Sequence, residues 1–225
     1  MGRIYIGTSA FSEPGWRGRF YPPDLSPEGM LTYYAEHLAA VEINSTFYRM
    51  PTPDLLARWA AQVPPAFRFA IKAPRRVGLA PGPALDRLLQ VLPALGAHLG
   101  AVMFQLPRFA PLDPEGLSAL LARLPPGLPA AFDFGHPVAE VDDLLRSAGA
   151  ARVGVDDAPP LPGRGFVYIR LRQASFPSAV WAERLRRHAA SGLDVYAFVK
   201  HAPDVDSPGR AVALAQEVAR SPAYR

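Results

Sequence analysis

The sequence of 225 residues contains no cysteine, and only two of its 24 basic Lys and Arg residues, Lys72 and Lys200, are lysines. The absence of cysteine excludes disulfides, thiolate metal sites and cysteine nucleophiles, and it is typical of proteins in a reducing compartment. No apolar run approaches the roughly 20 residues of a membrane span, and no apolar signal core follows Met1. We therefore expect a soluble, cytoplasmic protein that makes no contact with membranes.

Both lysines fall where a predicted strand runs out into a loop. Lysine differs from arginine because its amine can lose its proton when buried, and can then act as a base or a nucleophile. Lys72 and Lys200 therefore indicate a site at the strand ends. The alternative is that a genome rich in G and C exchanged lysine codons for arginine codons without any selection on chemistry.

The basic charge exceeds the acidic charge only slightly, with a net charge of +4 and a pI of about 9.6. This excess favours an anionic partner, either a small molecule or nucleic acid. The arginines are scattered without a dense basic run, so an ordinary arginine-rich surface is the competing interpretation. Because 49% of the chain is apolar, it can form a sizeable core, and we expect one domain over residues 1–225.

Short apolar runs alternate with longer amphipathic stretches along the whole chain. We predict eight strands, at Arg3–Thr8, Ala40–Asn44, Arg68–Ala73, Ala101–Leu106, Ala130–Phe134, Arg152–Asp156, Phe166–Arg172 and Val195–Lys200. We predict seven helices, at Pro27–Leu38, Pro53–Gln62, Ala84–His98, Pro114–Leu124, Ala139–Ala148, Ser178–Ser191 and Pro208–Arg220.

Strict alternation of strands and helices predicts parallel strands joined by helical crossovers. Eight such units in 225 residues predict an α/β fold, a single (β/α)₈ TIM-type barrel. The segment 157–164 between the sixth and seventh strands contains three prolines, so the barrel should lack the helix at this place. An open doubly wound sheet is the alternative, because periodicity alone does not close a sheet.

Several predicted strands carry polar side chains on one face, whereas buried parallel strands are usually apolar throughout. The apolar faces should meet the outer helices, so the polar faces should point into the barrel. The polar residues that we expect to converge at the carboxyl-end mouth are Glu42, Asn44, Lys72, Gln105, Asp133, Asp156, Arg170 and Lys200. The same residues could instead form a buried ion network that has no part in catalysis.

The second predicted strand opens a longer motif, Val41-Glu42-Ile43-Asn44-Ser45-Thr46-Phe47-Tyr48-Arg49. Other motifs along the chain are Ile6-Gly7-Thr8-Ser9, residues 16–22, Tyr33-Tyr34-Ala35, residues 69–75, Phe104-Gln105-Leu106-Pro107 and Tyr168-Ile169-Arg170-Leu171. Together they resemble the YecE-like family, domain of unknown function 72, from the first strand to the eighth. The resemblance implies a TIM-type barrel related in shape to endonuclease IV and xylose isomerase, and it implies no established activity.

The chain departs from the pattern of this family at three strand ends. After the fifth strand the family usually has Glu-x-Arg and then Ser-Trp, where this chain reads Asp133-Phe134-Gly135-His136-Pro137-Val138. The usual His-Gly after the seventh strand is replaced by Arg172-Gln173, and the usual Asn-Asn after the eighth by Val199-Lys200. Half of the mouth therefore differs from the family pattern, and the activity of the family need not carry over to this chain.

The residues of the predicted mouth suit an enzyme that acts on a phosphate-bearing or sugar-like substrate, or on nucleic acid. The candidate catalytic residues are Glu42, Lys72 and Asp133, with Glu42 as general acid or base. The candidate substrate-binding residues are Asn44, Tyr48, Arg49, Arg75, Gln105, Arg170, Lys200, Trp16 and Tyr21. The arginines would clamp an anion, and the aromatic rings of the first loop would stack on a base or sugar unless they pack onto the barrel rim.

Three alternatives remain open. A metal site would draw on Glu42, Asp133, His136, Asp156 and His201, but no tight ligand motif such as HExxH is present, and we predict no metal. A Schiff-base enzyme would use Lys72 or Lys200 as its amine. A non-catalytic protein would bind an anionic metabolite or nucleic acid, duplex DNA included. The sequence identifies neither a cofactor nor an oligomeric state.

Overall fold

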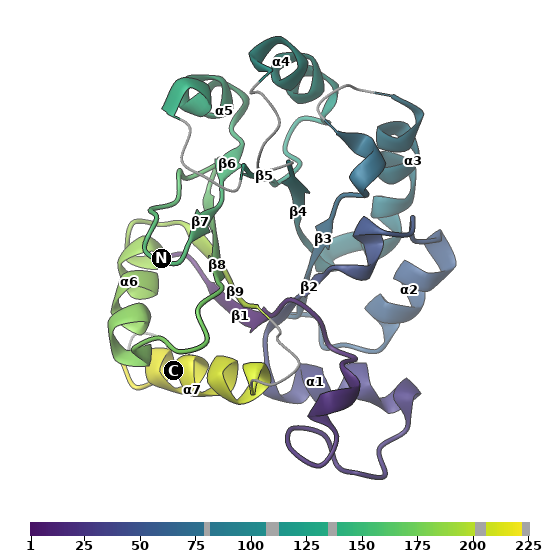
Figure 1. Ribbon diagram of the computed structural model, residues 1–225, viewed down its shortest axis with the longest axis vertical. Coiled ribbons are helices and arrows are strands. Elements are labelled where there is room, and N and C mark those ends of the chain that lie inside the picture. The colour runs from purple at the N-terminus through teal and green to yellow at the C-terminus, as the bar shows by residue number, and fades with distance from the viewer. Residues whose placement is uncertain (79–81, 107–112, 135–138, 201–205, 222–225) are drawn as a thin grey trace.

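The computed structural model describes residues 1–78, 82–106, 113–134, 139–200 and 206–221. The strands form a ring that is surrounded by helices (Figure 1). The strands in these residues are β1 Ile4–Thr8, β2 Ala40–Ile43, β3 Arg68–Lys72, β4 Leu99–Gln105, β5 Ala130–Asp133, β6 Ala151–Arg152, β7 Gly154–Val155, β8 Phe166–Leu171 and β9 Asp194–Val199. Neighbouring strands are parallel, in the order β6-β5-β4-β3-β2-β1-β9-β8-β7.

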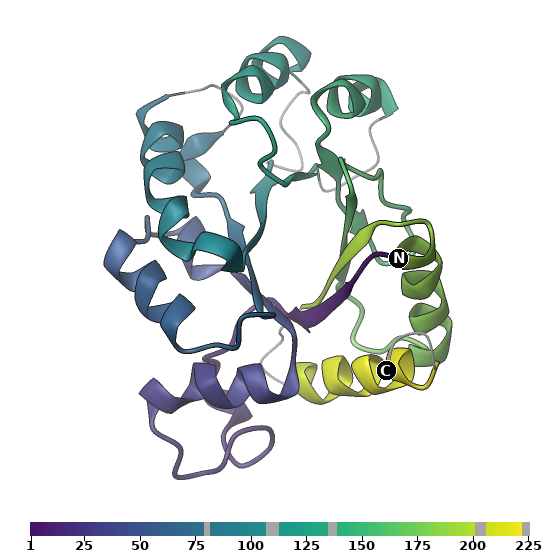
Figure 2. The same cartoon turned by 180° about the vertical axis from the view of Figure 1, so that it is seen from behind.

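The α-helices of the described residues follow the strands along the outside of the ring, which Figure 2 shows from behind. They are α1 Met30–His37, α2 Pro53–Ala61, α3 Pro83–Val91, α4 Pro114–Arg123, α5 Asp142–Ala148, α6 Ser178–Ala190 and α7 Ser207–Ala219. Three of them begin after a capping side chain, which comes from Thr52, Asp113 and Asp206. None of the helices described is long and apolar enough to cross a membrane.

The ring closes through the predicted sixth strand, which the structure splits at Val153 into β6 and β7. β6 pairs with β5, and β7 pairs with β8. Val153 donates its backbone N–H to the carbonyl of Phe132 on the β5 side, at 2.9 Å. The expected strand of residues 152–156 is therefore present but divided, because its two halves bond to opposite neighbours. This closure confirms the barrel and rejects the open doubly wound sheet.

The barrel lacks a helix between β7 and β8, as the prolines of this segment predict. Residues 157–165 fold back on the strand instead, and Arg152 and Leu161 exchange two backbone hydrogen bonds of 3.0 and 3.1 Å. The side chain of Arg152 also binds the carboxylate of Asp142, which lies at the start of α5, at 2.8 and 3.2 Å. A short hairpin-like segment thus covers the position where a helix would otherwise lie.

Three predicted helices end or begin differently in the structure. The predicted helix of residues 84–98 is α-helical only to Val91 and continues as a 3₁₀ segment over Leu92–His98. Pro93 supplies no backbone N–H and Gly96 has a positive φ of 51°, so neither continues an α-helix. The predicted helices of residues 27–38 and 139–148 each begin with a 3₁₀ turn, Pro27–Gly29 before α1 and Ala139–Val141 before α5.

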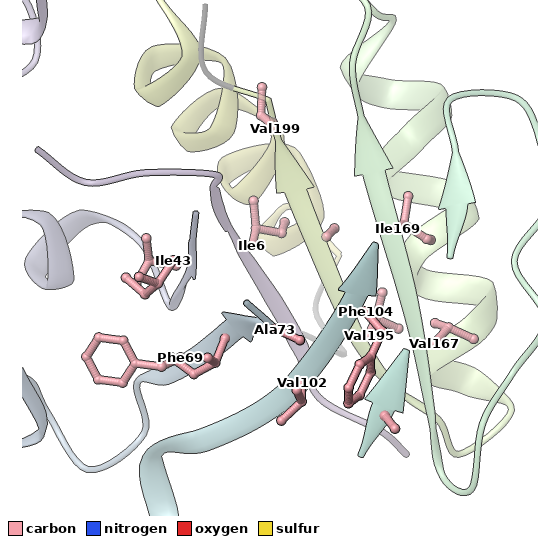
Figure 3. Packing of buried hydrophobic residues seen from close by; sticks show 14 of the residues in the cluster. Ile6, Ile43, Phe69, Ala73, Val102, Phe104, Val167, Ile169, Val195 and Val199 are labelled. Carbon is pink, nitrogen blue, oxygen red and sulfur yellow. The ribbon is translucent and has the colours of Figure 1, made fainter. Parts of the chain in front are cut away.

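The two faces of each strand separate as their period of two predicts. The outward apolar side chains of β2, β3, β4, β8 and β9 lie in the core between the ring and the helices, and Figure 3 shows part of this cluster. The inward side chains form a second cluster inside the ring. The polar residues of these strands therefore point into the barrel.

Small side chains line one part of the inside of the ring, and large aromatic side chains line the other. Strands β2 to β6 contribute the alanines Ala40, Ala70, Ala101, Ala131 and Ala151. Strands β1, β8 and β9 contribute the aromatic residues Tyr5, Phe166, Tyr168, Tyr196 and Phe198. The rings of Tyr5 and Tyr196 stack at 5.1 Å. The aromatic side chains fill the space that the alanines leave, so the part of the barrel around these residues is a packed core.

Tyr34 of α1 joins the first two strands through its hydroxyl group. This hydroxyl accepts the backbone N–H of Thr8 at 2.7 Å and donates to the carbonyl of Ala40 at 3.0 Å. The side chain is fully buried, and burial raises the pKa of its hydroxyl far above the usual value. Gly7 allows this approach, because a Cβ there would lie 1.8 Å from the carbonyl oxygen of Ala40.

We predict that Tyr34→Phe lowers the free energy of unfolding by about 1–3 kcal/mol, because two buried backbone groups lose their partner. Chemical denaturation measures this change. Tyr33→Phe is the matched control, since Tyr33 is half-buried and its hydroxyl makes no hydrogen bond to any described residue. Equal losses in the two variants would contradict the bridging role of Tyr34.

Candidate functional site

A buried ion network lies inside the barrel near the carboxyl ends of the strands. Arg170 of β8 donates to the Glu42 carboxylate of β2 at 2.8 Å and to the Asp133 carboxylate of β5 at 3.0 Å. Arg172, just after β8, also donates to Asp133. Glu42 is fully buried, and Asp133 and Arg170 are nearly so. One guanidinium therefore connects three strands across the barrel.

Tyr168 completes the shell of Glu42. Its hydroxyl donates to the second carboxylate oxygen of Glu42 at 2.7 Å. Burial, together with the charge of Glu42, raises the pKa of Tyr168 well above its usual value, so the hydroxyl stays a neutral donor. Burial alone would lower the pKa of Arg170, but Glu42 and Asp133 raise it, and the guanidinium stays charged. Both oxygens of Glu42 are thus engaged by protein groups.

A cavity of about 580 Å³ opens above this network at the mouth of the barrel. We call it the mouth cavity. The described residues that line it are Ser9, Asn44, Phe47, Tyr48, Lys72, Gln105, Arg170, Arg172 and Lys200. Four of these side chains are cationic, and none of them is a carboxylate. The two carboxylates of the network lie beneath the cavity, bound to arginines, so the lining presents positive charge to a ligand.

Lys72 is held at the end of β3 by its neighbours. Thr46 donates its hydroxyl to the carbonyl of Lys72 at 2.7 Å, which ties the turn after β2 to the end of β3. The same turn places the ring of Phe47 over the amine of Lys72, 4.0 Å from the ring centroid. Lys72 is buried. Burial, followed by the charge of Arg170, lowers the pKa of Lys72 to about 8.

Asn44 lines the mouth cavity and carries a buried acceptor. Its side-chain amide N–H₂ donates to the carbonyl of Ser9 at 2.6 Å, which fixes how the amide is turned. The carbonyl oxygen of the amide is buried and has no hydrogen-bond partner among the described residues. An unpaired buried acceptor is costly, and a donor on a ligand would relieve that cost.

Asp156 does not reach the mouth cavity, although we expected it there. Its carboxylate instead accepts the backbone N–H groups of Arg172 and Gln173, at 2.6 and 3.1 Å. Its φ is +50°, a conformation that Asp tolerates better than most residues. Asp156 therefore shapes the loop after β8 and indirectly positions Arg172.

The rings of Trp16 and Tyr21 are buried in the outer core, and the hydroxyl of Tyr21 donates to the carbonyl of Phe11. Neither residue lines the mouth cavity. This placement corresponds to the alternative in which the first loop packs onto the barrel. Neither ring presents a face to a ligand, so stacking by this pair, which the sequence suggested, finds no support here.

Three of the expected binding residues lie around a neighbouring cavity of about 630 Å³, which we call the arginine cavity. Arg49 and Arg75 line it, whereas Arg170 lines the mouth cavity. The three arginines therefore do not form one clamp, which corrects that expectation. Tyr48 lines both cavities, together with Phe47.

Several residues that line the mouth cavity were not among the site residues expected from the sequence. The period of two places Arg172 on the polar face with Tyr168 and Arg170, but we did not expect it at the mouth. Phe47 lies in a turn, where no periodicity indicates which way a side chain points. No group of three or more His, Asp or Glu side chains in the described residues could hold a metal. His136, His201, Gly135 and Val138 lie outside the described residues.

The comparisons with known proteins agree with this architecture. A family model, "Protein of unknown function DUF72", matches residues 5–224. The chain is 31% identical to the UPF0759 protein YecE of Escherichia coli (strain K12) over 140 residues. This alignment covers 60% of this chain and 48% of YecE. It is also 29% identical to the UPF0759 protein YunF of Bacillus subtilis (strain 168) over 70 residues, and this alignment covers 31% of this chain and 24% of YunF. The chain thus matches about half the length of YecE and a quarter of YunF.

Two solved structures of DUF72 proteins share the fold at low sequence identity. The protein from Thermotoga maritima MSB8 has a TM-score of 0.77 and 20% identity, covering 96% of this chain and 99% of its own. The protein from Enterococcus faecalis V583 has a TM-score of 0.72 and 18% identity, covering 97% and 96%. Because the family model also spans almost the entire sequence, this chain belongs to the DUF72 family, whose function is unknown.

Proposed function

We propose that the mouth cavity binds a phosphate-bearing small molecule and that Lys72 transfers a proton to or from it. The observation that carries this proposal is the charge of the lining, in which Lys72, Arg170, Arg172 and Lys200 face the cavity and none of the described residues contributes a carboxylate. Arginine and lysine side chains are the usual protein partners of phosphate oxygens. Asn44 and Gln105 add polar atoms for an uncharged part of the ligand, such as a sugar hydroxyl.

Lys72 is the titratable group best suited to chemistry at this site. With its pKa lowered to about 8, its amine exists in both protonation states near neutral pH. Such an amine can act as a general base or acid, or as the nucleophile of a Schiff base. Phe47 covers the amine on one side, so a ligand has to approach Lys72 from the mouth cavity.

Glu42 is better suited to holding the site than to reacting in it. The carboxylate is fully buried and both of its oxygens are bonded, to Tyr168 and Arg170. A general base needs a lone pair within reach of the substrate, whereas Glu42 has no exposed surface and does not line the mouth cavity. We therefore reassign Glu42 from catalysis to positioning of Arg170, and Asp133 takes the same role from the opposite side.

A non-catalytic binding protein is the second candidate, and the engagement of both carboxylates favours it. In that case the ligand binds in the same mouth cavity but leaves it unchanged. Lys72→Met would then alter affinity alone, whereas an enzyme would lose turnover and keep its fold. Product analysis with the ligands that bind separates the two candidates.

Glu42→Gln should lower the free energy of unfolding by about 3 kcal/mol or more, because Arg170 loses a buried partner charge. The control is Glu183→Gln, since Glu183 is half exposed and pairs with Arg186 and Arg187 on the surface of α6. This control should change stability by about 0.5 kcal/mol or less. If Glu42→Gln is as stable as the original chain, the structural role is wrong and Glu42 returns as a catalytic candidate.

Lys200→Gln should weaken the binding of phosphate-bearing ligands about three- to tenfold, because Lys200 is exposed at the cavity and its charge attracts the anion. Calorimetric titration at low ionic strength with inorganic phosphate and sugar phosphates measures this loss. Arg58→Ala on α2 removes the same charge away from both cavities and should have no effect. An absence of saturable binding by every phosphate compound would refute the proposed ligand class.

The scarcity of lysine makes the titration of Lys72 directly measurable. After reductive methylation with a ¹³C label, Lys72→Met identifies the NMR signal of Lys72, and Lys200→Met serves as the matched control. That signal should titrate near pH 8. Bound phosphate should move the midpoint upward, because a nearby anion favours the charged amine. An unchanged midpoint at saturating phosphate would place the bound anion away from Lys72.

A further inference from the structure

The lining of the arginine cavity is strongly basic. Its described lining includes four arginines, Arg49, Arg75, Arg76 and Arg87, and no carboxylate. They come from the turn after β2, from the 3₁₀ segment Arg75–Val77 after β3, and from α3. Segments that are distant in the sequence therefore place their guanidinium groups around one hollow.

These four arginines have no acidic partner among the described residues, since none of the ion pairs found there includes them. Other exposed arginines of the chain do pair, for example Arg123 with Asp86 at 2.5 Å and Arg184 with Asp157 at 2.9 Å. Like charges around one cavity repel one another unless an anion lies between them. The cavity is therefore suited to an anionic group that the chain itself does not supply.

Tyr48 lies between the arginine cavity and the mouth cavity. Its side chain is 85% exposed, and it is the only exposed Phe, Tyr or Trp in the described part of the chain. The ring meets Phe47 edge-on, with centroids 5.3 Å apart and planes at 89°. Phe47 in turn covers Lys72, so the two aromatic residues separate the two cavities. An exposed ring at this position offers a face on which a flat group can stack.

We infer that the ligand spans both cavities and is a nucleoside with a phosphate on each side. Its base stacks on Tyr48, one phosphate reaches the mouth cavity near Lys72 and Lys200, and the other binds the four arginines. This inference rests on the proposed function of the mouth cavity, and it adds a second anion site and a base platform. Volumes of about 580 and 630 Å³ leave room for such a ligand.

Two sources supply this chemistry, a free nucleoside bisphosphate and a single strand of nucleic acid. Both present two phosphates separated by one nucleoside, so the recognising groups are the same. The test therefore compares adenosine 5′-monophosphate, adenosine 3′,5′-bisphosphate and a 5′-phosphorylated tetranucleotide, each titrated calorimetrically into the full chain. Tighter binding of the tetranucleotide than of the bisphosphate identifies nucleic acid as the source, and the reverse order identifies the free nucleotide.

The bisphosphate should bind about tenfold more tightly than the monophosphate, because it gains charge-assisted contacts in the arginine cavity. The double variant Arg75→Ala/Arg87→Ala should abolish this advantage and leave the affinity for the monophosphate unchanged. Arg58→Ala controls for the loss of surface charge. An advantage that persists in the double variant, or that is absent from the original chain, overturns the inference while the mouth cavity keeps its proposed ligand.

Tyr48→Ala tests the base platform separately. It should weaken both nucleotides about tenfold, because stacking on the ring is lost. The affinity for pentane-1,5-diol bisphosphate, which has two phosphates and no ring, should not change. Equal losses for the nucleotides and the diol would overturn the stacking role. If no phosphate compound binds and Lys200→Gln changes nothing, the proposed function of the mouth fails, and the spanning ligand fails with it.

Discussion

The site depends on one guanidinium, that of Arg170, held between two carboxylates inside the barrel. Glu42 and Asp133 come from strands on opposite sides of β8 in the ring order, so their bonds to Arg170 cross the barrel. Each buried charge alone would cost several kcal/mol of folding free energy, and it is tolerated here because every charge has a close partner. The network also fixes the geometry at the mouth, since Tyr168 and Arg172 are oriented by the same two carboxylates.

The two carboxylates of the network offset the charges of its two arginines, so the charge that remains at the site is positive. Glu42 and Asp133 are bonded beneath the mouth cavity, whereas Lys72 and Lys200 reach its lining and have no carboxylate within 4 Å among the described residues. The mouth cavity is therefore positive although its immediate floor is close to neutral. Field lines between low-dielectric barrel walls strengthen this potential at the opening. The arginine cavity extends the same sign past Tyr48, which is why one ligand with two anionic groups suits the whole region.

Much of this arrangement could be predicted from the sequence, because it follows from periodicity. The inward position of Glu42 and Arg170 follows from the period of two in β2 and β8, and the missing helix follows from the prolines after β7. Other features depend on contacts that no local pattern encodes. The rings of Trp16 and Tyr21 belong to a loop, where nothing in the sequence states which way a side chain points. The split of β6 from β7 depends on which neighbour each half bonds, and Arg49 and Arg170 enter different cavities because of the turn that carries Phe47 and Tyr48.

The choice between arginine and lysine at the mouth has a physical consequence. Arginine stays protonated throughout the neutral pH range, so the charges of Arg170 and Arg172 do not change with pH there. Lysine can lose its charge when buried, and the field of Arg170 is one of the causes that lower the pKa of Lys72. The network thus does more than hold the barrel together: the guanidinium that Glu42 and Asp133 stabilise also makes the neighbouring amine easier to deprotonate. The two carboxylates act in the opposite direction and raise the pKa of Lys72, so they partly offset the effect of burial and of Arg170. Glu42 therefore influences the pKa of Lys72 through its charge, in addition to holding Arg170 in place.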